Sequence, residues 1–134
     1  MSAQKGLEHW HRTMQAGNRP DDLRKIIRED AVFHSPVVHS PQQGRDLVVT
    51  YLAAAGQTLG NNSFAYVREL VDGDNAMLEF TTEMDGVHVN GIDLIEFDED
   101  GMIADFKVMI RPLKAVNKVW EMMAAQLQAG ASKG

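Results

Sequence analysis

Cysteine is absent from this chain of 134 residues. Its absence excludes disulfide bridges, thiol nucleophiles and cysteine-based metal sites. No run of about 18 apolar residues occurs either, so the sequence predicts no membrane-spanning helix and no membrane partner. The first residues, Met1 to Lys5, lack the apolar core of a secretory signal peptide, and we therefore expect a cytoplasmic protein.

Basic residues are scarce. The chain has 13 Lys and Arg against 19 Asp and Glu, which gives a formal net charge of −6. Phosphate binding requires clustered positive charge, so the composition argues against nucleic acid as a partner. A hydrophobic content of 44% is typical of a globular protein, and the length suits one domain, which we assign to residues 1–134.

Cofactor and metal motifs are missing as well. The chain has neither a glycine-rich phosphate loop nor a nucleophile elbow. His9 and His11 lie two residues apart on an expected helix and therefore face different directions. We expect no metal site and no cofactor.

Helical patterns come first along the chain, and strand patterns follow. Apolar spacing predicts helices over residues 3–16 and 44–55, a short helix that begins at Pro20, and a last helix that begins at Pro112. Alternation predicts strands over residues 31–35, 64–71, 76–84, 87–97 and 102–110. This order is typical of the α+β class. We expect a curved antiparallel sheet wrapped on the N-terminal helices, forming a cone with an apolar pocket, and a C-terminal helix.

Asp93 is a lone carboxylate on an apolar sheet face. The dipeptide Asp85-Gly86 predicts a tight hairpin that places Leu78 opposite Asp93, and the following turn is expected to place Phe106 on its other side. A carboxylate in such surroundings is costly to ionise, so its pKa should rise or a partner should satisfy it. Asp93 is therefore a candidate functional acid; the alternative is a structural acid bonded to a loop backbone or a tyrosine.

Four stretches of the chain carry a family resemblance: Gln15-Ala16-Gly17-Asn18, Ala31-Val32-Phe33-His34-Ser35-Pro36, Gly44-Arg45 and Gly91-Ile92-Asp93-Leu94-Ile95-Glu96-Phe97. In this order they resemble the nuclear transport factor 2-like, or SnoaL-like, superfamily, over residues 7 to about 110. Members of that superfamily include ketosteroid isomerases, polyketide cyclases, limonene epoxide hydrolase, scytalone dehydratase and binding domains. Because one fold carries many functions, the site must decide the activity.

The resemblance to ketosteroid isomerases implies a role for three positions. Their pocket combines an aspartate base with a tyrosine and a protonated aspartic acid that hold an oxyanion. Asp93 stands at the position of the protonated acid. Trp10 replaces the tyrosine, and Ser35 replaces the aspartate base. Serine does not abstract a proton at neutral pH without a base of its own, so the resemblance argues against isomerisation by that mechanism.

Two loop histidines are candidates for the missing base. His39 lies at an expected pocket rim, and His34 is adjacent to Ser35 but should point to the opposite face by alternation. The alternative is that both are loop residues satisfied by backbone or water. The candidate catalytic residues are Asp93, His39 and His34.

Alternation leaves the direction of the Tyr66 side chain open. The expected pocket-lining residues are Trp10, Ser35, Tyr51, Leu78, Phe80, Ile95, Phe106, Val108 and Ile110.

Three functions are consistent with this pattern. The first is a domain that binds a small apolar molecule, with or without oxygen, in its pocket. The second is an isomerase, cyclase, dehydratase or hydrolase that uses Asp93 with a loop histidine. The third is a non-catalytic interaction domain that forms a homodimer through its outer sheet face or its last helix.

Overall fold

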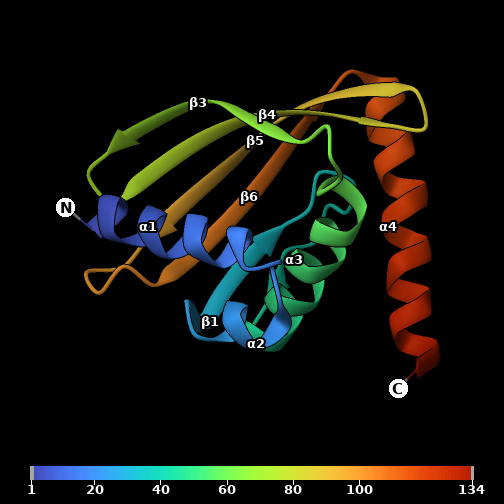
Figure 1. Cartoon of the computed structure of the whole chain (residues 1–134). Helices are drawn as coiled ribbons and strands as arrows, with labels where there is room; N and C mark the ends of the chain where they lie inside the picture. The colour runs from blue at the N-terminus through green and yellow to red at the C-terminus, as the bar shows by residue number, and fades with distance from the viewer. Residues whose placement is uncertain (1, 134) are drawn as a thin grey trace.

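The computed structural model describes the backbone of residues 2–133 and the side chains of residues 3–125. Four helices and six strands follow one another along the chain (Figure 1): α1 (Ser2–Gln15), α2 (Pro20–Arg24), β1 (Ile27–His34), β2 (Gln42–Gln43), α3 (Arg45–Leu59), β3 (Ala65–Asp72), β4 (Asn75–Met84), β5 (Val87–Phe97), β6 (Ile103–Arg111) and α4 (Leu113–Lys133). Among the described residues, no helix is both long and apolar enough to cross a bilayer.

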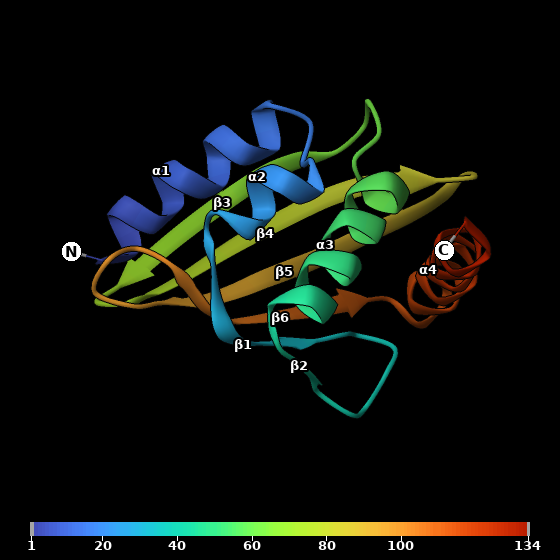
Figure 2. The ribbon, with the colours of Figure 1, turned by 90° about the horizontal axis from the view of Figure 1, so that it is seen from below.

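The six strands form one curved sheet in the order β2-β1-β6-β5-β4-β3. Neighbouring strands are antiparallel except β1 and β6, which are parallel. Helices α1, α2 and α3 lie on one face of the sheet (Figure 2). The predicted α+β class with a curved sheet packed on N-terminal helices is confirmed. The two-residue strand β2 was not predicted, and it completes the edge beside β1.

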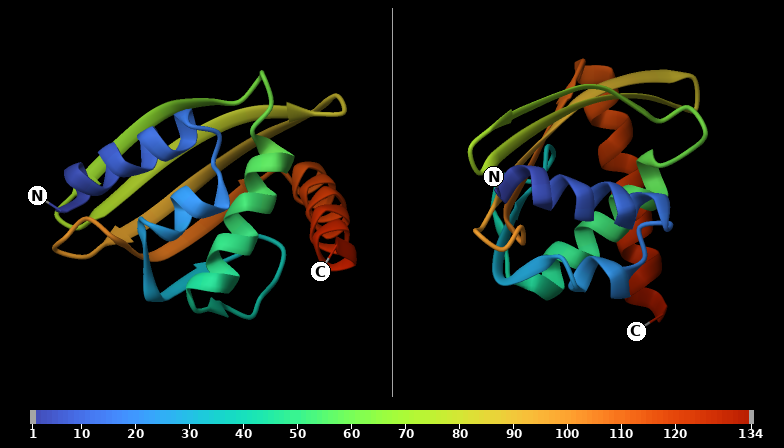
Figure 3. Two further views of the ribbon diagram at one scale, coloured as in Figure 1. Left: turned by 60° about the horizontal axis from the view of Figure 1, so that its bottom comes forward. Right: turned by 60° about the vertical axis from the view of Figure 1, so that its left-hand side comes forward.

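Helix α4 stands at one end of the sheet, beside α3 rather than across the sheet (Figure 3). The Lys118 ammonium of α4 lies 2.9 Å from the Asp85 carboxylate in the turn between β4 and β5. Val119 and Met123 are buried on the inner side of α4, whereas Trp120 is 58% exposed on the outer side. The helix therefore closes one end of the space between the sheet and α3.

The hairpin between β4 and β5 has the predicted register. Asp85 and Gly86 both adopt positive φ, at 51° and 79°, which matches the two-residue turn that fits the twist of antiparallel strands. Leu78 lies opposite Asp93, and Phe80 lies opposite Gly91. The inner face of both strands is buried, because side chains alternate strictly along a strand.

The next hairpin differs from the prediction. Asp93 lies opposite Val108, not opposite Phe106, which pairs with Ile95. The turn is longer than expected, since Asp98 Oδ1 accepts hydrogen bonds from the backbone N–H groups of Asp100 and Met102, and the register shifts between Glu96 and Phe97. The observed pairing of β5 with β6 is displaced by two residues from the predicted pairing. A displacement by an even number of residues preserves alternation, so Phe106 and Val108 still face the core.

Candidate functional site

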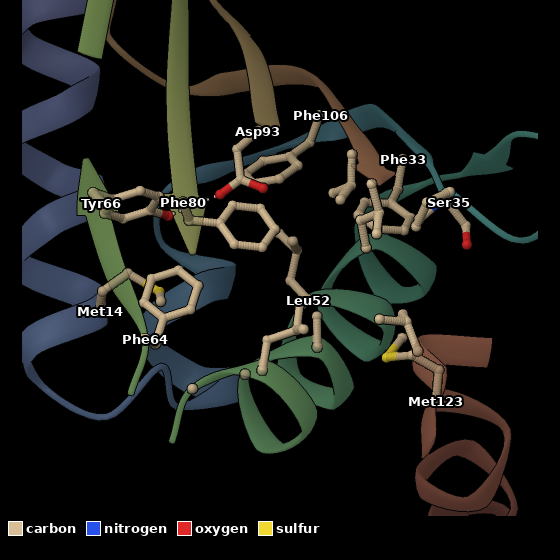
Figure 4. Close-up of a pocket in the computed structure, with 18 of the residues that line it drawn as sticks. Met14, Phe33, Ser35, Leu52, Phe64, Tyr66, Phe80, Asp93, Phe106 and Met123 are labelled. Carbon is tan, nitrogen blue, oxygen red and sulfur yellow. Dashed lines mark hydrogen bonds between the residues drawn. The ribbon is translucent and has the colours of Figure 1, made fainter. Parts of the chain in front are cut away.

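A pocket lies between the inner face of the sheet and the helices (Figure 4). The inner cavity has a volume of about 50 Å³, and the space not filled by atoms is about 610 Å³ when the open mouth is included. The lining is mostly apolar and comes from several elements, including Trp10 and Met14 of α1, Leu52 of α3, Phe80 of β4, Phe106 of β6 and Met123 of α4. In this conformation the inner part is narrow, so a ligand larger than a few atoms extends into the mouth.

Asp93 is the acidic group in this apolar wall. Its side chain projects from β5 into the pocket, and the residue is only 7% exposed (Figure 4). The Tyr66 hydroxyl donates a hydrogen bond of 2.8 Å to Asp93 Oδ2, and the Trp10 indole N–H donates one of 3.1 Å to the Tyr66 oxygen. These three residues, which we call the Trp10–Tyr66–Asp93 chain, connect α1, β3 and β5.

Burial determines the ionisation of Asp93 and Tyr66. Desolvation raises the pKa of Asp93 from its usual 3.8 to about 7, although the hydrogen bond from Tyr66 acts in the opposite direction. Desolvation also raises the pKa of Tyr66 well above its usual value, and the nearby Asp93 charge adds to that effect. Asp93 is therefore a neutral acid below about pH 7 and ionises above it, and Tyr66 remains protonated.

The position of Tyr66 depends on an irregularity in β3. Tyr66 pairs with Phe80, and the register then shifts before Arg68 pairs with Glu79. Because paired residues share a face, Tyr66 points inward with Phe80. The Phe64 ring stacks on Phe80 at 5.2 Å and meets Tyr66 edge-on at 5.1 Å. Alternation within β3 alone could not assign this direction. The pairing with the apolar side of β4 was the missing signal.

Gly91 provides the space that Phe80 occupies. A Cβ atom at residue 91 would lie 2.4 Å from Phe80 Cζ and 2.9 Å from the Met109 carbonyl oxygen. Any larger residue at this position would displace the Phe80 ring from the pocket wall. The glycine of the Gly91-to-Phe97 motif therefore has a packing role beside Asp93.

Most of the expected pocket-lining residues lie in the pocket wall. Six do so: Trp10, Ser35, Phe80, Phe106, Val108 and Ile110. Leu78 and Ile95 are fully buried in the core instead, and Tyr51 packs against Phe33 at a ring distance of 5.5 Å. The residues that sequence reasoning missed come mainly from the helices and from β3, because an amphipathic helix pattern does not separate core contacts from pocket contacts.

The two candidate histidines lie away from Asp93. His34 Nε2 is 2.9 Å from Asp105 Oδ1, on the other face of the sheet from the pocket, as alternation predicted. His39 is exposed in the loop between β1 and β2 and does not line the pocket. Ser35 does line the pocket, but its hydroxyl accepts a hydrogen bond of 3.2 Å from the Val37 N–H and points away from Asp93 (Figure 4).

The chemistry available in the pocket is therefore limited. Among the described lining residues, only Asp93 and Tyr66 carry ionisable groups. Across the part of the chain that the structure describes, no three His, Asp or Glu side chains converge in a way that could hold a metal ion. The pocket offers one carboxylic acid within an apolar wall, and below about pH 7 this acid is neutral and can donate a hydrogen bond.

Comparisons with known proteins agree with this architecture. A steroid delta-isomerase from Pseudomonas aeruginosa is 34% identical, with a TM-score of 0.90 over 98% of this chain and 95% of that one. A bacterial protein with a cystatin-like fold from Silicibacter pomeroyi DSS-3 is 29% identical, with a TM-score of 0.83 over 92% of this chain and 88% of that one. An NTF2-like protein from Mesorhizobium loti is 21% identical, with a TM-score of 0.69 over 84% of this chain and 95% of that one.

No curated protein matches the chain. Residues 7–106 match the family model of the SnoaL-like domain, which is most of the chain. The resemblance that the motifs predicted is thus confirmed: the chain belongs to the SnoaL-like domain family, within the NTF2-like fold.

Proposed function

We propose that the protein binds a small, mostly apolar molecule that carries one oxygen acceptor, and that Asp93 donates a hydrogen bond to that oxygen. The observation that supports this proposal is the Trp10–Tyr66–Asp93 chain in an apolar pocket wall. A ketone or a similar carbonyl compound has the required chemistry, since its oxygen accepts hydrogen bonds and its body is apolar.

The hydrogen bonds in the chain have a consistent direction. The Trp10 N–H donates to Tyr66, and the Tyr66 O–H donates to Asp93 Oδ2. Among the described residues, Asp93 Oδ1 has no hydrogen-bond partner. When Asp93 is protonated on Oδ1, its O–H is the one donor among Trp10, Tyr66 and Asp93 that remains free for a ligand. The same chain would stabilise negative charge that develops on a bound oxygen.

Binding is better supported than catalysis. The Pseudomonas aeruginosa neighbour is described as a steroid delta-isomerase, and isomerisation there would require a base that moves a proton. In this chain Ser35 stands at the expected position of that base, His34 is paired with Asp105, and His39 is exposed. An enzymatic role that combines Asp93 with a loop histidine would require a rearrangement of the loop between β1 and β2.

The pH dependence of binding tests the proposal. We would titrate wild type and Asp93→Asn with 4-androsten-3-one, a rigid apolar ketone, by calorimetry between pH 5 and pH 9. For wild type, the dissociation constant should rise above pH 7, by roughly tenfold per pH unit, because the ionised acid no longer donates. Asp93→Asn keeps an N–H donor that does not ionise, so its affinity should not change over this range. A wild-type affinity that is constant from pH 5 to pH 9 would refute the role of Asp93.

A second function, homodimer formation, is supported by exposed apolar side chains. Leu70 of β3 and Met109 of β6 lie on the outer sheet face and are 55% and 46% exposed, and Leu113 of α4 is 74% exposed. We would compare wild type, Met109→Glu and Leu113→Glu by size-exclusion chromatography with light scattering. A dimer that only Met109→Glu disrupts would assign the sheet face, and one that only Leu113→Glu disrupts would assign α4. A monomeric wild type at micromolar concentration would refute this function.

A further inference from the structure

The inner cavity beside Asp93 is too small for the kind of ligand proposed above. Its volume is about 50 Å³. An apolar cavity of about 150 Å³ holds one benzene ring, so a ring system that carries an oxygen to Asp93 needs a larger space. Part of the pocket wall must therefore move when such a ligand binds. The packing of each wall indicates which part moves.

The sheet, α1 and α3 are closely packed parts of the wall. Backbone hydrogen bonds join the strands of the sheet. Helix α1 lies so near the sheet that a Cβ atom at Gly6 would be 2.1 Å from the Phe97 ring, and Trp10 is hydrogen-bonded to Tyr66. Helix α3 is held against the core by its buried face, which includes Leu52. Movement of any of these three parts would disrupt the core.

Helix α4 is less firmly attached. It stands at one end of the sheet (Figure 3), and the chain enters it from β6 through Arg111 and Pro112, which are both exposed. On the described part of α4, the buried side chains are Ala115, Val119 and Met123. They are spaced by four residues and so form one narrow stripe on the helix. A swing of α4 about its exposed start would separate only this stripe from the rest of the protein.

Two residues of the stripe close the pocket. Val119 and Met123 line it, and they are 2% and 6% exposed. In Figure 4 Met123 lies on the side of the pocket opposite Tyr66, on the same side as Ser35. Methionine is flexible and fills irregular gaps, which suits a side chain that leaves and re-enters a cavity. An outward swing of α4 would withdraw both side chains and enlarge the inner cavity.

An ion pair holds α4 in the closed position. Lys118 directly precedes Val119, and its Nζ lies 2.9 Å from Asp85 Oδ2 in the turn between β4 and β5. The hydrogen bond to Asp85 raises the pKa of Lys118, so the ammonium group stays charged. Glu121 is 3.9 Å from the same ammonium group but belongs to α4 itself. Among the ion pairs of the described residues, Lys118–Asp85 is the one that joins α4 to another element.

We propose that α4 is a movable cover of the pocket, held closed by the Lys118–Asp85 ion pair, and that this pair opposes the binding of any ligand larger than the inner cavity. The cover rests on the proposed function, since the ligand is the molecule that binds at Asp93. In the bound state the ligand takes the place of Val119 and Met123, and the ion pair is broken. Weakening the pair should therefore raise the affinity and the association rate by the same factor, with no change in the dissociation rate.

The movement of α4 can be measured without a ligand. Because the chain has no cysteine, Met123→Cys introduces a single thiol on the inner side of α4. Its rate of modification by methyl methanethiosulfonate, a small uncharged reagent, is followed by mass spectrometry. Val48→Cys, which is fully buried in α3, reports the unfolding of the whole domain. Met123→Cys should react faster than Val48→Cys by about tenfold or more. Equal rates would overturn the proposal.

A second substitution tests the ion pair. Lys118→Met keeps the length of the side chain and removes its charge. In the Met123→Cys protein it should accelerate thiol modification by about 2- to 5-fold, the value of one exposed ion pair. Lys25→Met is the matched control, because it removes an ion pair with Asp22 at a distance from α4, and it should have no effect. No acceleration by Lys118→Met, or the same acceleration by Lys25→Met, would overturn the role of the pair.

A fluorescent ketone tests the effect on binding. Prodan, 6-propionyl-2-dimethylaminonaphthalene, is uncharged, and its emission moves to shorter wavelength in apolar surroundings. At pH 6, Lys118→Met should bind prodan about 2- to 5-fold more tightly than wild type, through faster association. Equal affinities would overturn the cover, and an affinity that still falls above pH 7 would leave the proposed function standing. Absence of binding to both proteins would refute the proposed function, and the thiol rates would still decide whether α4 moves.

Discussion

Replacing Asp93 by Asn should change how the stability of the protein depends on pH. The pKa of Asp93 is about 7 in the folded protein and near the usual 3.8 once the chain unfolds. Below pH 4 the acid is protonated in both states, so its full contribution to stability is present. Between pH 4 and pH 7 the unfolded chain releases this proton while the folded protein keeps it. Stability therefore falls as the pH rises through this window, and the loss is complete above pH 7.

The magnitude follows from the size of the shift. A raise of roughly three units corresponds to about 4 kcal/mol, because each unit is worth about 1.4 kcal/mol. Asp93→Asn does not ionise and cannot show this loss. The free energy of unfolding of the variant relative to wild type should thus increase by about 4 kcal/mol between pH 4 and pH 8. For a domain of this size that is a large part of the total stability.

Urea unfolding followed by circular dichroism at pH 4, 6 and 8 measures this difference. The other carboxylates titrate in both proteins and cancel in the comparison. Asp72→Asn, a substitution of an exposed aspartate at the end of β3, is the matched control and should show no comparable change. A difference between Asp93→Asn and wild type that is the same at pH 4 and pH 8 would refute the assignment of Asp93 as a desolvated acid.

Three further predictions concern the same pocket. Tyr66→Phe removes a hydrogen bond that lowers the pKa of Asp93, so carboxyl-carbon NMR should give a pKa above 7; an unchanged value would contradict the hydrogen bond. Gly91→Ala should destabilise the protein by about 1 to 3 kcal/mol, measured by thermal unfolding, because its Cβ overlaps Phe80; wild-type stability would exclude that close approach. Ser35→Asp places a carboxylate in the pocket wall, where it can act as a base. It should convert 5-androsten-3-one to the conjugated ketone about 100-fold faster than wild type does, as measured by ultraviolet absorbance. No gain in rate would show that residue 35 cannot act on a ketone bound at Asp93.

Local signals in the sequence were sufficient for the part of the fold that holds Asp93. Asp85-Gly86 fixes both the turn and the register of β4 and β5, so the buried position of Asp93 followed from alternation alone. The turn after Phe97 was harder, because the hydrogen bonds of Asp98 Oδ1 to the backbone extend it beyond the simplest two-residue form.

The partners of Asp93 could not be predicted in the same way. Tyr66 reaches Asp93 only because the register of β3 shifts after Tyr66, and such shifts have no reliable signature within one strand. Asn18, which lies between α1 and α2, likewise meets Leu52 and Gly56 of α3, which are far from it in the sequence. Contacts of this kind depend on tertiary geometry, which neither composition nor periodicity specifies.

The two tryptophans of the chain give it a built-in optical reporter. Trp10 is 2% exposed and donates its indole N–H to Tyr66, whereas Trp120 is 58% exposed on the outside of α4. Iodide should quench the emission of Trp120 and leave that of Trp10 almost unaffected. Trp120→Phe would then leave Trp10 as the single tryptophan, hydrogen-bonded to Tyr66 beside Asp93. Occupancy of the pocket, and protonation of its acid, become visible in the emission of Trp10 without any added label.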